Sequence, residues 1–124
     1  MTLKELYSKI DGNYEQAIGI LRIEKLIDKH IRKFPNGGVV DNVLAAGEKM
    51  DAAELFEAAH AMKGVCSNLG LAKLAAAASE ITEEYRPGKE RKLSDDAVRE
   101  KLAGIGKLYN KTKEGINEYV NSAQ

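Results

Sequence analysis

Two apolar stripes with helical spacing lie on either side of Gly70, and they limit the possible folds more than any other feature of the chain. The first stripe recurs at steps of three and four residues and consists of Leu55, Ala59, Met62, Cys66 and Leu69. The second has similar spacing and consists of Leu71, Leu74, Ala78, Ile81 and Tyr85. Such spacing places each set on one face of an α-helix. Because so few residues join the two helices, they must pack against each other as an antiparallel hairpin.

Helix-start signals and helix breakers divide the rest of the chain into further segments. The start signals are two capping-box patterns, Thr2 with Glu5 and Asp51 with Glu54, and two typical N-cap residues, Asn13 and Ser94. The breakers are Asp11-Gly12, the run from Pro35 to Gly38, and Pro87-Gly88. We therefore expect helices between these points.

Apolar stripes also predict which residues of these segments are buried. After Asn13 the stripe consists of Ile20, Ile23, Ile27, Ile31 and Phe34. After the breaker at Pro35 it continues with Val40, Val43, Leu44 and Gly47. The last helix carries Val98, Leu102, Ile105, Tyr109, Thr112, Ile116 and Tyr119. The pattern leaves open whether the segments on either side of Pro35 form one bent helix or two.

Composition and connection lengths lead to one fold class. Ala, Leu, Lys and Glu are abundant, and the alternating β-branched runs typical of strands are absent. Because the connections are short, consecutive helices become antiparallel neighbours. We predict an all-α fold: an antiparallel up-down four-helix bundle with one or two additional N-terminal helices. The 124 residues suffice for a single domain, 1–124, with the bundle core at about residues 36–121 and the N-terminal helices at about 2–34.

Charge and cysteine content argue against several classes of partner and site. Lys plus Arg and Asp plus Glu both number 19, so no excess charge points to nucleic acid or to an anionic membrane. The single cysteine, Cys66, excludes an internal disulfide, and its place on a buried stripe indicates a core residue. Charged residues from Lys4 onward argue against a signal peptide or a membrane span. We therefore expect a cytoplasmic protein without nucleic-acid or membrane partners.

The first helix of the hairpin carries an unusual group of residues opposite its buried stripe. At about 100° per residue, His60 lies on the outer face. The residues that flank it are Lys63, Gly64 and Ser67, and Phe56 lies one turn earlier. A lone surface histidine or lysine is usually only solvated. Here, however, Gly64 costs the helix about 1 kcal/mol relative to alanine and clears space beside the imidazole. Open space, a cation, an apolar neighbour and a nucleophile therefore coincide on one patch.

Few kinds of chemistry fit an exposed histidine on a convex helix face. A metal site needs more ligands, and the only other histidine, His30, lies on another segment. Hydrolysis needs a base, an orienting group and an oxyanion hole, and the chain has no glycine-rich loop of the kind that cradles nucleotide phosphates. An exposed imidazole, largely neutral near pH 7, can still attack an activated phosphoryl group that a partner brings. The residues therefore favour a phosphocarrier protein over an enzyme.

The stretch HAMKGVCSNLG resembles the signature of the histidine-containing phosphotransfer (HPt) domains of two-component phosphorelays. That signature reads approximately His-x-x-Lys-Gly, followed by Asn or Ser four residues after the Gly and by another Gly two residues further on. The signature residues present here are His60, Lys63, Gly64, Asn68 and Gly70. The flanking helical pattern extends the resemblance over most of the chain, from near residue 13 to near residue 120.

The resemblance implies a role for each matching residue. His60 would accept a phosphoryl group from the phosphoaspartate of a response-regulator receiver domain, or from a histidine kinase or hybrid sensor kinase. It would then pass the group, reversibly, to the aspartate of another receiver. Lys63 would stabilise the phosphate charge, and Gly64 would give the partner steric access. The resemblance implies no cofactor and no metal in this chain, because the Mg²⁺ belongs to the receiver.

The resemblance also places a partner-docking surface around His60. We assign Phe56, Glu57 and Ser67 to it, although Phe56 can equally be a packing residue at the edge of the bundle. The main alternative function is a helical adaptor that binds receiver or kinase domains through the same surface without phosphotransfer. Whether the chain stands alone or is part of a larger sensor is left open.

One position departs from the family pattern. Many members carry Gln or Glu on the next helix, 22 residues after the histidine, where it bonds the imidazole and sets its tautomer. Here that position is Thr82, with Glu83 beside it, and these two residues are the candidates for orienting the ring. Because Thr82 is shorter than Gln, the sequence leaves open what orients His60.

Overall fold

The computed structural model describes residues 1–122, so the last two residues of the predicted domain lie outside the described part. Within it the chain forms seven α-helices, one short 3₁₀ helix and no strand, which confirms the predicted all-α class. The elements are α1 (Leu3–Lys9), α2 (Tyr14–Leu21), α3 (Glu24–Lys33), η1 (Phe34–Asn36), α4 (Val39–Lys49), α5 (Ala52–Asn68), α6 (Ala72–Glu84) and α7 (Asp95–Ser122). No helix in residues 1–122 combines the length and the apolar character needed to span a bilayer.

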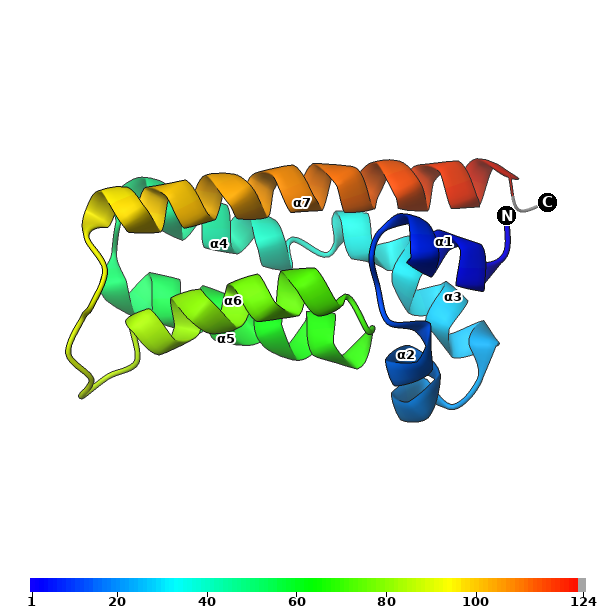
Figure 1. Ribbon diagram of the computed structural model, residues 1–124, viewed down its shortest axis with the longest axis horizontal. Helices are drawn as coiled ribbons and strands as arrows, with labels where there is room; N and C mark the ends of the chain where they lie inside the picture. Colours follow the sequence, from blue (N-terminus) through cyan, green and yellow to red (C-terminus); the bar gives the residue numbers. More distant parts are fainter. Residues whose placement is uncertain (123–124) are drawn as a thin grey trace.

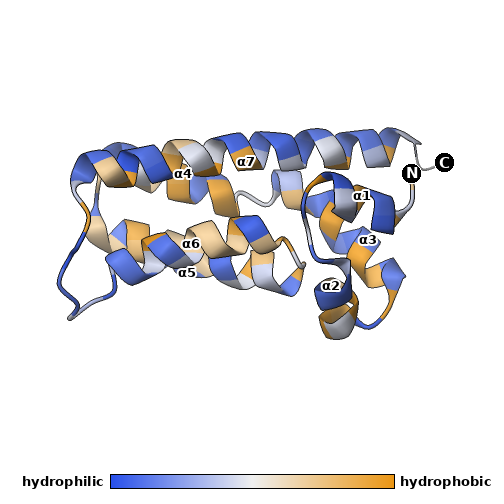
Figure 2. Cartoon of the chain, in the orientation of Figure 1, coloured by the Kyte–Doolittle hydropathy of each residue, from blue (hydrophilic) through white to orange (hydrophobic). Residues whose placement is uncertain are grey.

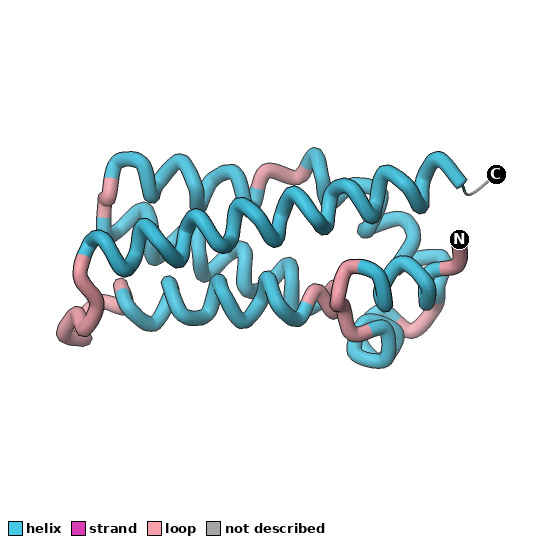
Figure 3. Tube along the Cα trace, turned by 45° about the horizontal axis from the view of Figure 1, so that its top comes forward, coloured by secondary structure: helices cyan, strands magenta, loops and turns pink. Residues whose placement is uncertain are grey.

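Four helices, α4 to α7, form a bundle in which each helix runs opposite to the one before it (Figure 1). The loops that join them lie at the two ends of the bundle, as the tube in Figure 3 also shows. The longest helix is α7, with 28 residues, and its second half continues past α4 to lie beside the N-terminal helices. Figure 2 shows hydrophobic segments on the inner sides of α4, α5 and α6, and a mainly hydrophilic outer surface on α7.

Three predicted stripes supply most of the bundle core. Every residue of the stripes on either side of Gly70 and on α7 is buried, with at most 7 % of its surface exposed. Burial of a large aliphatic side chain contributes about 1.5–3 kcal/mol, so these stripes provide the main driving force for packing. On α4, Val40, Val43 and Gly47 are buried as predicted, and Leu44 is half-buried.

The corner between α5 and α6 joins the hairpin to the N-terminal part of the chain. Gly70 adopts a left-handed φ of 68°, which a residue without a side chain reaches without strain. Its carbonyl accepts a hydrogen bond from the Asn13 backbone N–H at 2.7 Å. A Cβ on Gly70 would overlap the Asn13 carbonyl oxygen, so only glycine permits this close approach. The corner therefore fixes both the hairpin turn and the start of α2.

Three short helices precede the bundle, where the sequence predicted one or two. Arg22 adopts a positive φ of 76° and ends α2, which interrupts the first predicted stripe. The later part of that stripe, on α3 and η1, is buried. Ile20 and Ile23, however, are 46 % and 53 % exposed. Their predicted burial is wrong, because the break at Arg22 resets the helical register.

Helix ends mostly follow the predicted signals. The capping box at the start of α1 is complete, and both predicted N-cap residues accept backbone hydrogen bonds. At the start of α5, Asp51 accepts from the Glu54 backbone N–H at 2.9 Å, but the Glu54 carboxylate lies 3.5 Å from Lys49 Nζ, so this capping box is half-formed. The segments around Pro35 are two helices, because η1 and Gly38, with a φ of 79°, separate α3 from α4.

Polar contacts attach the N-terminal helices to the bundle. The Tyr7 hydroxyl on α1 donates to the Leu69 carbonyl at 2.7 Å, inside the protein. Asp11 accepts from Lys111 Nζ on α7 at 2.8 Å and from Lys73 Nζ on α6 at 3.2 Å. The N-terminal helices therefore have defined contacts with the hairpin and with α7.

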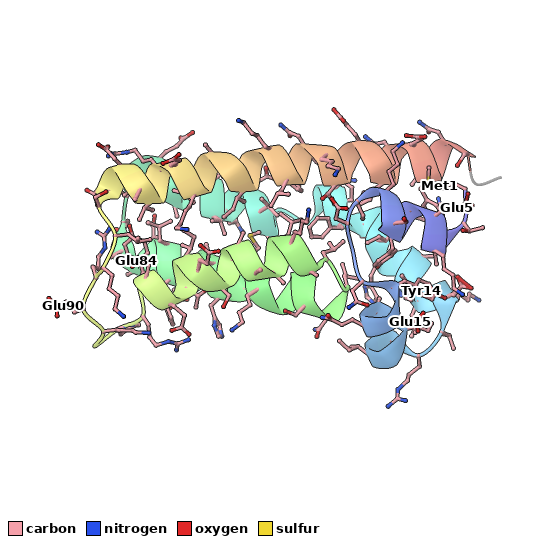
Figure 4. The ribbon with its side chains drawn as sticks, in the orientation of Figure 1. Met1, Glu5, Tyr14, Glu15, Glu84 and Glu90 are labelled. Atoms are coloured by element: carbon pink, nitrogen blue, oxygen red, sulfur yellow. The ribbon has the colours of Figure 1, made fainter. Side chains whose placement is uncertain are left out.

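A buried carboxylate holds the loop between α6 and α7. The Glu84 side chain is 6 % exposed and accepts from the backbone N–H of Lys92 at 3.1 Å and of Leu93 at 2.9 Å. Arg91 Nε donates to the same carboxylate at 3.2 Å. Figure 4 shows Glu84 on the inner side of the loop and Glu90 at its outer edge. Burial by itself raises the pKa of Glu84, but these hydrogen bonds outweigh it and leave the pKa below its ordinary value of 4.5.

Replacing Glu84 with glutamine should lower the free energy of unfolding at pH 7 by about 1–3 kcal/mol, because an amide accepts these hydrogen bonds less well and turns an N–H toward donors. A carboxylate whose pKa is lower in the folded than in the unfolded protein stabilises the fold at pH values above the unfolded pKa. This stabilisation is lost as the pH falls through the pKa of the folded protein. The difference between wild type and variant should therefore narrow as the pH falls below about 4.5. Urea unfolding at several pH values measures both effects.

The matched control for this experiment is Glu80→Gln, which removes only an exposed ion pair with Lys101. Its effect on the free energy of unfolding should stay below about 0.5 kcal/mol. Equal losses in the two variants at pH 7 would contradict the role assigned to Glu84.

Candidate functional site

Helix α5 presents the predicted site residues on its outer face. Its stripe from Leu55 to Leu69 is buried in the bundle, whereas His60, on the opposite side, is exposed. The imidazole therefore lies outside the core, as the helical spacing predicted. The surface around it is convex, because α5 is a regular helix over 17 residues.

An aromatic ring lies against the imidazole. The centroids of the Phe56 and His60 rings are 5.8 Å apart, and the planes meet at 19°, which is a stacked arrangement. Phe56 is half-buried: one part of its side chain packs against the core and another part stays accessible. Both roles left open for Phe56, packing at the bundle edge and contact with a partner, are therefore compatible with its position.

A cation from the end of α6 contacts the same phenylalanine. Arg86 Cζ lies 5.6 Å from the centroid of the Phe56 ring, within the range of a cation–π interaction. Glu83 holds this guanidinium in a two-pronged pair, with Nε and Nη2 at 2.9 and 3.1 Å from its carboxylate oxygens. The hydrogen bonds from Arg86, with its charge and that of Lys89, lower the pKa of Glu83 to about 2. The pair is thus charged on both sides at physiological pH.

Sequence reasoning missed Arg86. The residue lies two positions after the end of α6, in a polar and basic loop. No spacing rule connects it with Phe56, since Phe56 lies on α5 and Arg86 lies in the loop after α6. The contact arises from the packing of the hairpin.

Gly64 and Lys63, the two neighbours of the imidazole on α5, contribute different features to the site. A Cβ built on Gly64 would meet no atom within 4 Å, so the surface beside His60 is open there. Lys63 is half-buried, and within residues 1–122 its amino group forms no hydrogen bond or ion pair with another side chain. Glu57 is exposed on the same part of α5. The site therefore combines an accessible ring with an available cation.

Ser67 lies where α5 meets the N-terminal helices. Its side chain is half-buried, and its carbonyl accepts a hydrogen bond from Gln16 Nε2 on α2 at 2.8 Å. This hydrogen bond attaches α2 to the C-terminal part of α5.

The residues expected to orient the ring are engaged elsewhere. Thr82 is fully buried, and its hydroxyl donates to the Ala78 carbonyl of its own helix at 2.8 Å. The Glu83 carboxylate is taken up by Arg86 and Lys89. Neither candidate, Thr82 or Glu83, bonds the imidazole: in the described part of the chain, no hydrogen bond involves a nitrogen of the His60 ring.

Groups that hold metals or carry redox chemistry do not assemble at this site. Within residues 1–122, no three His, Cys, Asp or Glu side chains come together in a way that could hold a metal ion. Cys66 is buried, and burial raises the pKa of its thiol to about 12, so it stays protonated at neutral pH. Its predicted place in the core is confirmed.

Exposed apolar side chains gather at the corner of α2 and α3, and sequence reasoning missed this as well. Ile20, Ile23 and Leu26 are between 37 % and 53 % exposed, and Val65 on α5 is 37 % exposed. Figure 2 shows hydrophobic segments at this corner. Two of them, Ile20 and Ile23, belong to the stripe that the sequence predicts to be buried.

Taken together, the site offers a nucleophile but no enclosed active site. The nitrogens of an imidazole react through lone pairs in the ring plane, and stacking covers only a face of the ring. The open space over Gly64 leaves room for a second protein at the same place. A site of this kind can react with a group that a second protein presents, since the face of α5 leaves room for one.

Comparison with known proteins agrees with this geometry. The sequence model of the family described as "Hpt domain" matches residues 21–114, a range that includes α3 to α6, most of α7 and the whole site around His60. Neither the comparison with curated proteins nor that with solved structures gave a match. Because the family match covers well over half of the chain, the protein belongs to the Hpt domain family, the phosphocarrier modules of two-component signalling systems.

Proposed function

We propose that the protein is a phosphorelay intermediate that carries a phosphoryl group on His60. It accepts the group from the aspartate of a response-regulator receiver domain, or from a histidine kinase or hybrid sensor kinase, and passes it on to a receiver. The observation that carries the proposal is an exposed imidazole beside a glycine with open space around it, on a helix face free of enclosing structure. Membership of the Hpt domain family supports it.

The transfer step needs little from this chain besides the nucleophile. A lone pair of a His60 ring nitrogen attacks the phosphorus of an aspartyl phosphate. The N–P bond forms while the P–O bond to the aspartate breaks, and the carboxylate leaves with the bonding electrons. The reverse step regenerates the imidazole and the aspartyl phosphate, so the direction depends on the partners. Mg²⁺ would be held by the receiver, and we propose no cofactor for this chain.

Two neighbours of His60 support this step. We assign Lys63 to the phosphoryl oxygens, because its amino group is available on the same side of α5 and a cation offsets the charge that the phosphate brings. We assign Gly64 to steric access, because any side chain there would project into the space that a partner must enter.

The docking surface would surround these residues. Phe56, Glu57 and Ser67 border His60 on α5 and are accessible to different degrees. The receiver would lie over this face of α5 with its aspartate directed at the imidazole. Two-component receivers act in the cytoplasm, and we propose the same location for this protein.

Replacing His60 with glutamine should abolish labelling by a receiver domain carrying a radioactive aspartyl phosphate, because the nucleophile is gone. Wild type should take up a label that is labile to acid and stable to base, as expected for phosphohistidine. His30→Gln, which removes the only other histidine, is the control and should be labelled like wild type. Label on the His60→Gln variant would overturn the proposal, and receiver binding without label on wild type would favour the adaptor function.

Replacing Lys63 with alanine should slow transfer by about three- to tenfold, the factor expected for the loss of one charge-assisted contact to the phosphoryl group. Thermal unfolding should be unchanged, because Lys63 has no described partner within the fold. Lys63→Arg should keep most of the rate, and Lys107→Ala, an exposed lysine on α7, should behave like wild type. Rapid-quench measurements of transfer from phosphorylated receiver provide the rates.

Substitutions at Gly64 should separate stability from transfer. Gly64→Ala should raise the free energy of unfolding by up to about 1 kcal/mol, because alanine favours the helix and its Cβ meets no neighbour. Gly64→Gln should nearly abolish transfer for steric reasons while the protein stays folded. Chemical unfolding and the receiver assay measure the two effects. Normal transfer by Gly64→Gln would show that this glycine is not needed for access.

A further inference from the structure

No polar contact among residues 1–122 explains the orientation of the His60 ring. Within the described residues, neither ring nitrogen takes part in a hydrogen bond, and Thr82 is committed to the Ala78 carbonyl. An exposed side chain without a partner samples several rotamers, and holding it in one of them costs conformational entropy. Transfer nevertheless requires the attacking nitrogen to point at the phosphorus. Some other contact must restrict the ring.

The stacked phenylalanine is in the right place to do so. In an α-helix, long side chains lean toward the N-terminus and lie over the residue one turn earlier. For His60 that residue is Phe56, and the rings are 5.8 Å apart with planes only 19° from parallel. A near-parallel, offset stack of this kind restricts the tilt of the imidazole. It leaves both ring nitrogens free in the ring plane, the one with the lone pair and the one with the hydrogen, whereas a hydrogen bond would engage one of them.

Phe56 is itself held in place, which a positioning residue requires. Part of its side chain packs against the bundle core. Arg86, from the end of α6, places its guanidinium 5.6 Å from the ring centroid. Glu83 fixes that guanidinium through two hydrogen bonds at 2.9 and 3.1 Å. A chain of contacts therefore leads from the end of α6 to the imidazole on α5.

We propose that Phe56, held by Arg86, is a positioning residue that sets the plane of the His60 ring for phosphoryl transfer by stacking. This role rests on the proposed function of His60. It differs from docking, because it acts on the rate of the step within the complex and not on the formation of the complex. Phe56→Leu separates the two roles, since leucine keeps an apolar surface for a partner and removes the aromatic face.

The first test measures transfer from phosphorylated receiver as a function of receiver concentration. For Phe56→Leu we expect the maximal rate to fall by about two- to tenfold, the range that corresponds to one aromatic pair. The receiver concentration for half-maximal rate should change little. Phe56→Tyr, which keeps the ring, should restore the maximal rate. An unchanged maximal rate with a raised half-saturating concentration would overturn positioning in favour of docking.

The second test does not depend on phosphotransfer. In the free protein, the ring-proton NMR signals of His60 should be shifted upfield by the Phe56 ring in wild type and in Phe56→Tyr. They should move toward the values of an unstacked histidine in Phe56→Leu. Arg86→Met, which keeps an aliphatic stem and leaves the core untouched, should move them part of the way. Identical His60 signals in wild type and Phe56→Leu would overturn the proposal.

The two tests also separate this inference from the function on which it rests. If wild type transfers and Phe56→Leu transfers equally fast at saturation, positioning alone is overturned. If wild type takes no label while the NMR signals show the stack, the phosphorelay function fails, and the role of Phe56 in transfer fails with it. Thermal unfolding of each variant checks that the bundle is intact.

Discussion

Packing of the apolar stripe of α5 into the hairpin with α6 is the interaction on which the rest of the structure depends. Because that stripe is buried, the opposite face of α5 must face water, and His60 lies on it. The corner at Gly70 then brings the start of α2 against the end of the hairpin through the hydrogen bond from Asn13. A rotation of α5 about its axis would expose the stripe and bury the imidazole. The packing of the core therefore also determines that His60 is exposed.

The site itself consists of few elements, because in the proposed transfer a partner would supply most of the chemistry. What the chain contributes is a nucleophile, a nearby cation and open space, and Gly64 provides the space at some cost in helix stability. The polar groups that would orient the imidazole are engaged in the fold, with Thr82 bonded to its own helix and Glu83 paired with Arg86. Aromatic contact with Phe56 is what remains to restrict the ring. Orientation would then depend on apolar packing, which suits a side chain that must keep both nitrogens accessible.

Much of the fold could be predicted, because helices of this kind depend on residues three and four positions apart. The hairpin stripes, the α7 stripe and most helix ends were predicted correctly for that reason. The prediction failed at Ile20 and Ile23, where the chain breaks at Arg22 with a positive φ. Arginine is not a residue type that indicates a positive φ. The helical spacing therefore predicts one uninterrupted stripe, and only the packing of α2 and α3 reveals the break.

For the site, the sequence by itself determined that His60, Lys63 and Gly64 share the outer face of one helix, since their spacing and the opposed apolar stripe follow from helix geometry alone. It also carried the signature of the Hpt domain family. Only the tertiary structure decided that Arg86 reaches Phe56 and that Thr82 turns inward. The physical reason is that contacts between helices depend on the rotation and separation of the packed pair, and no local pattern encodes these quantities.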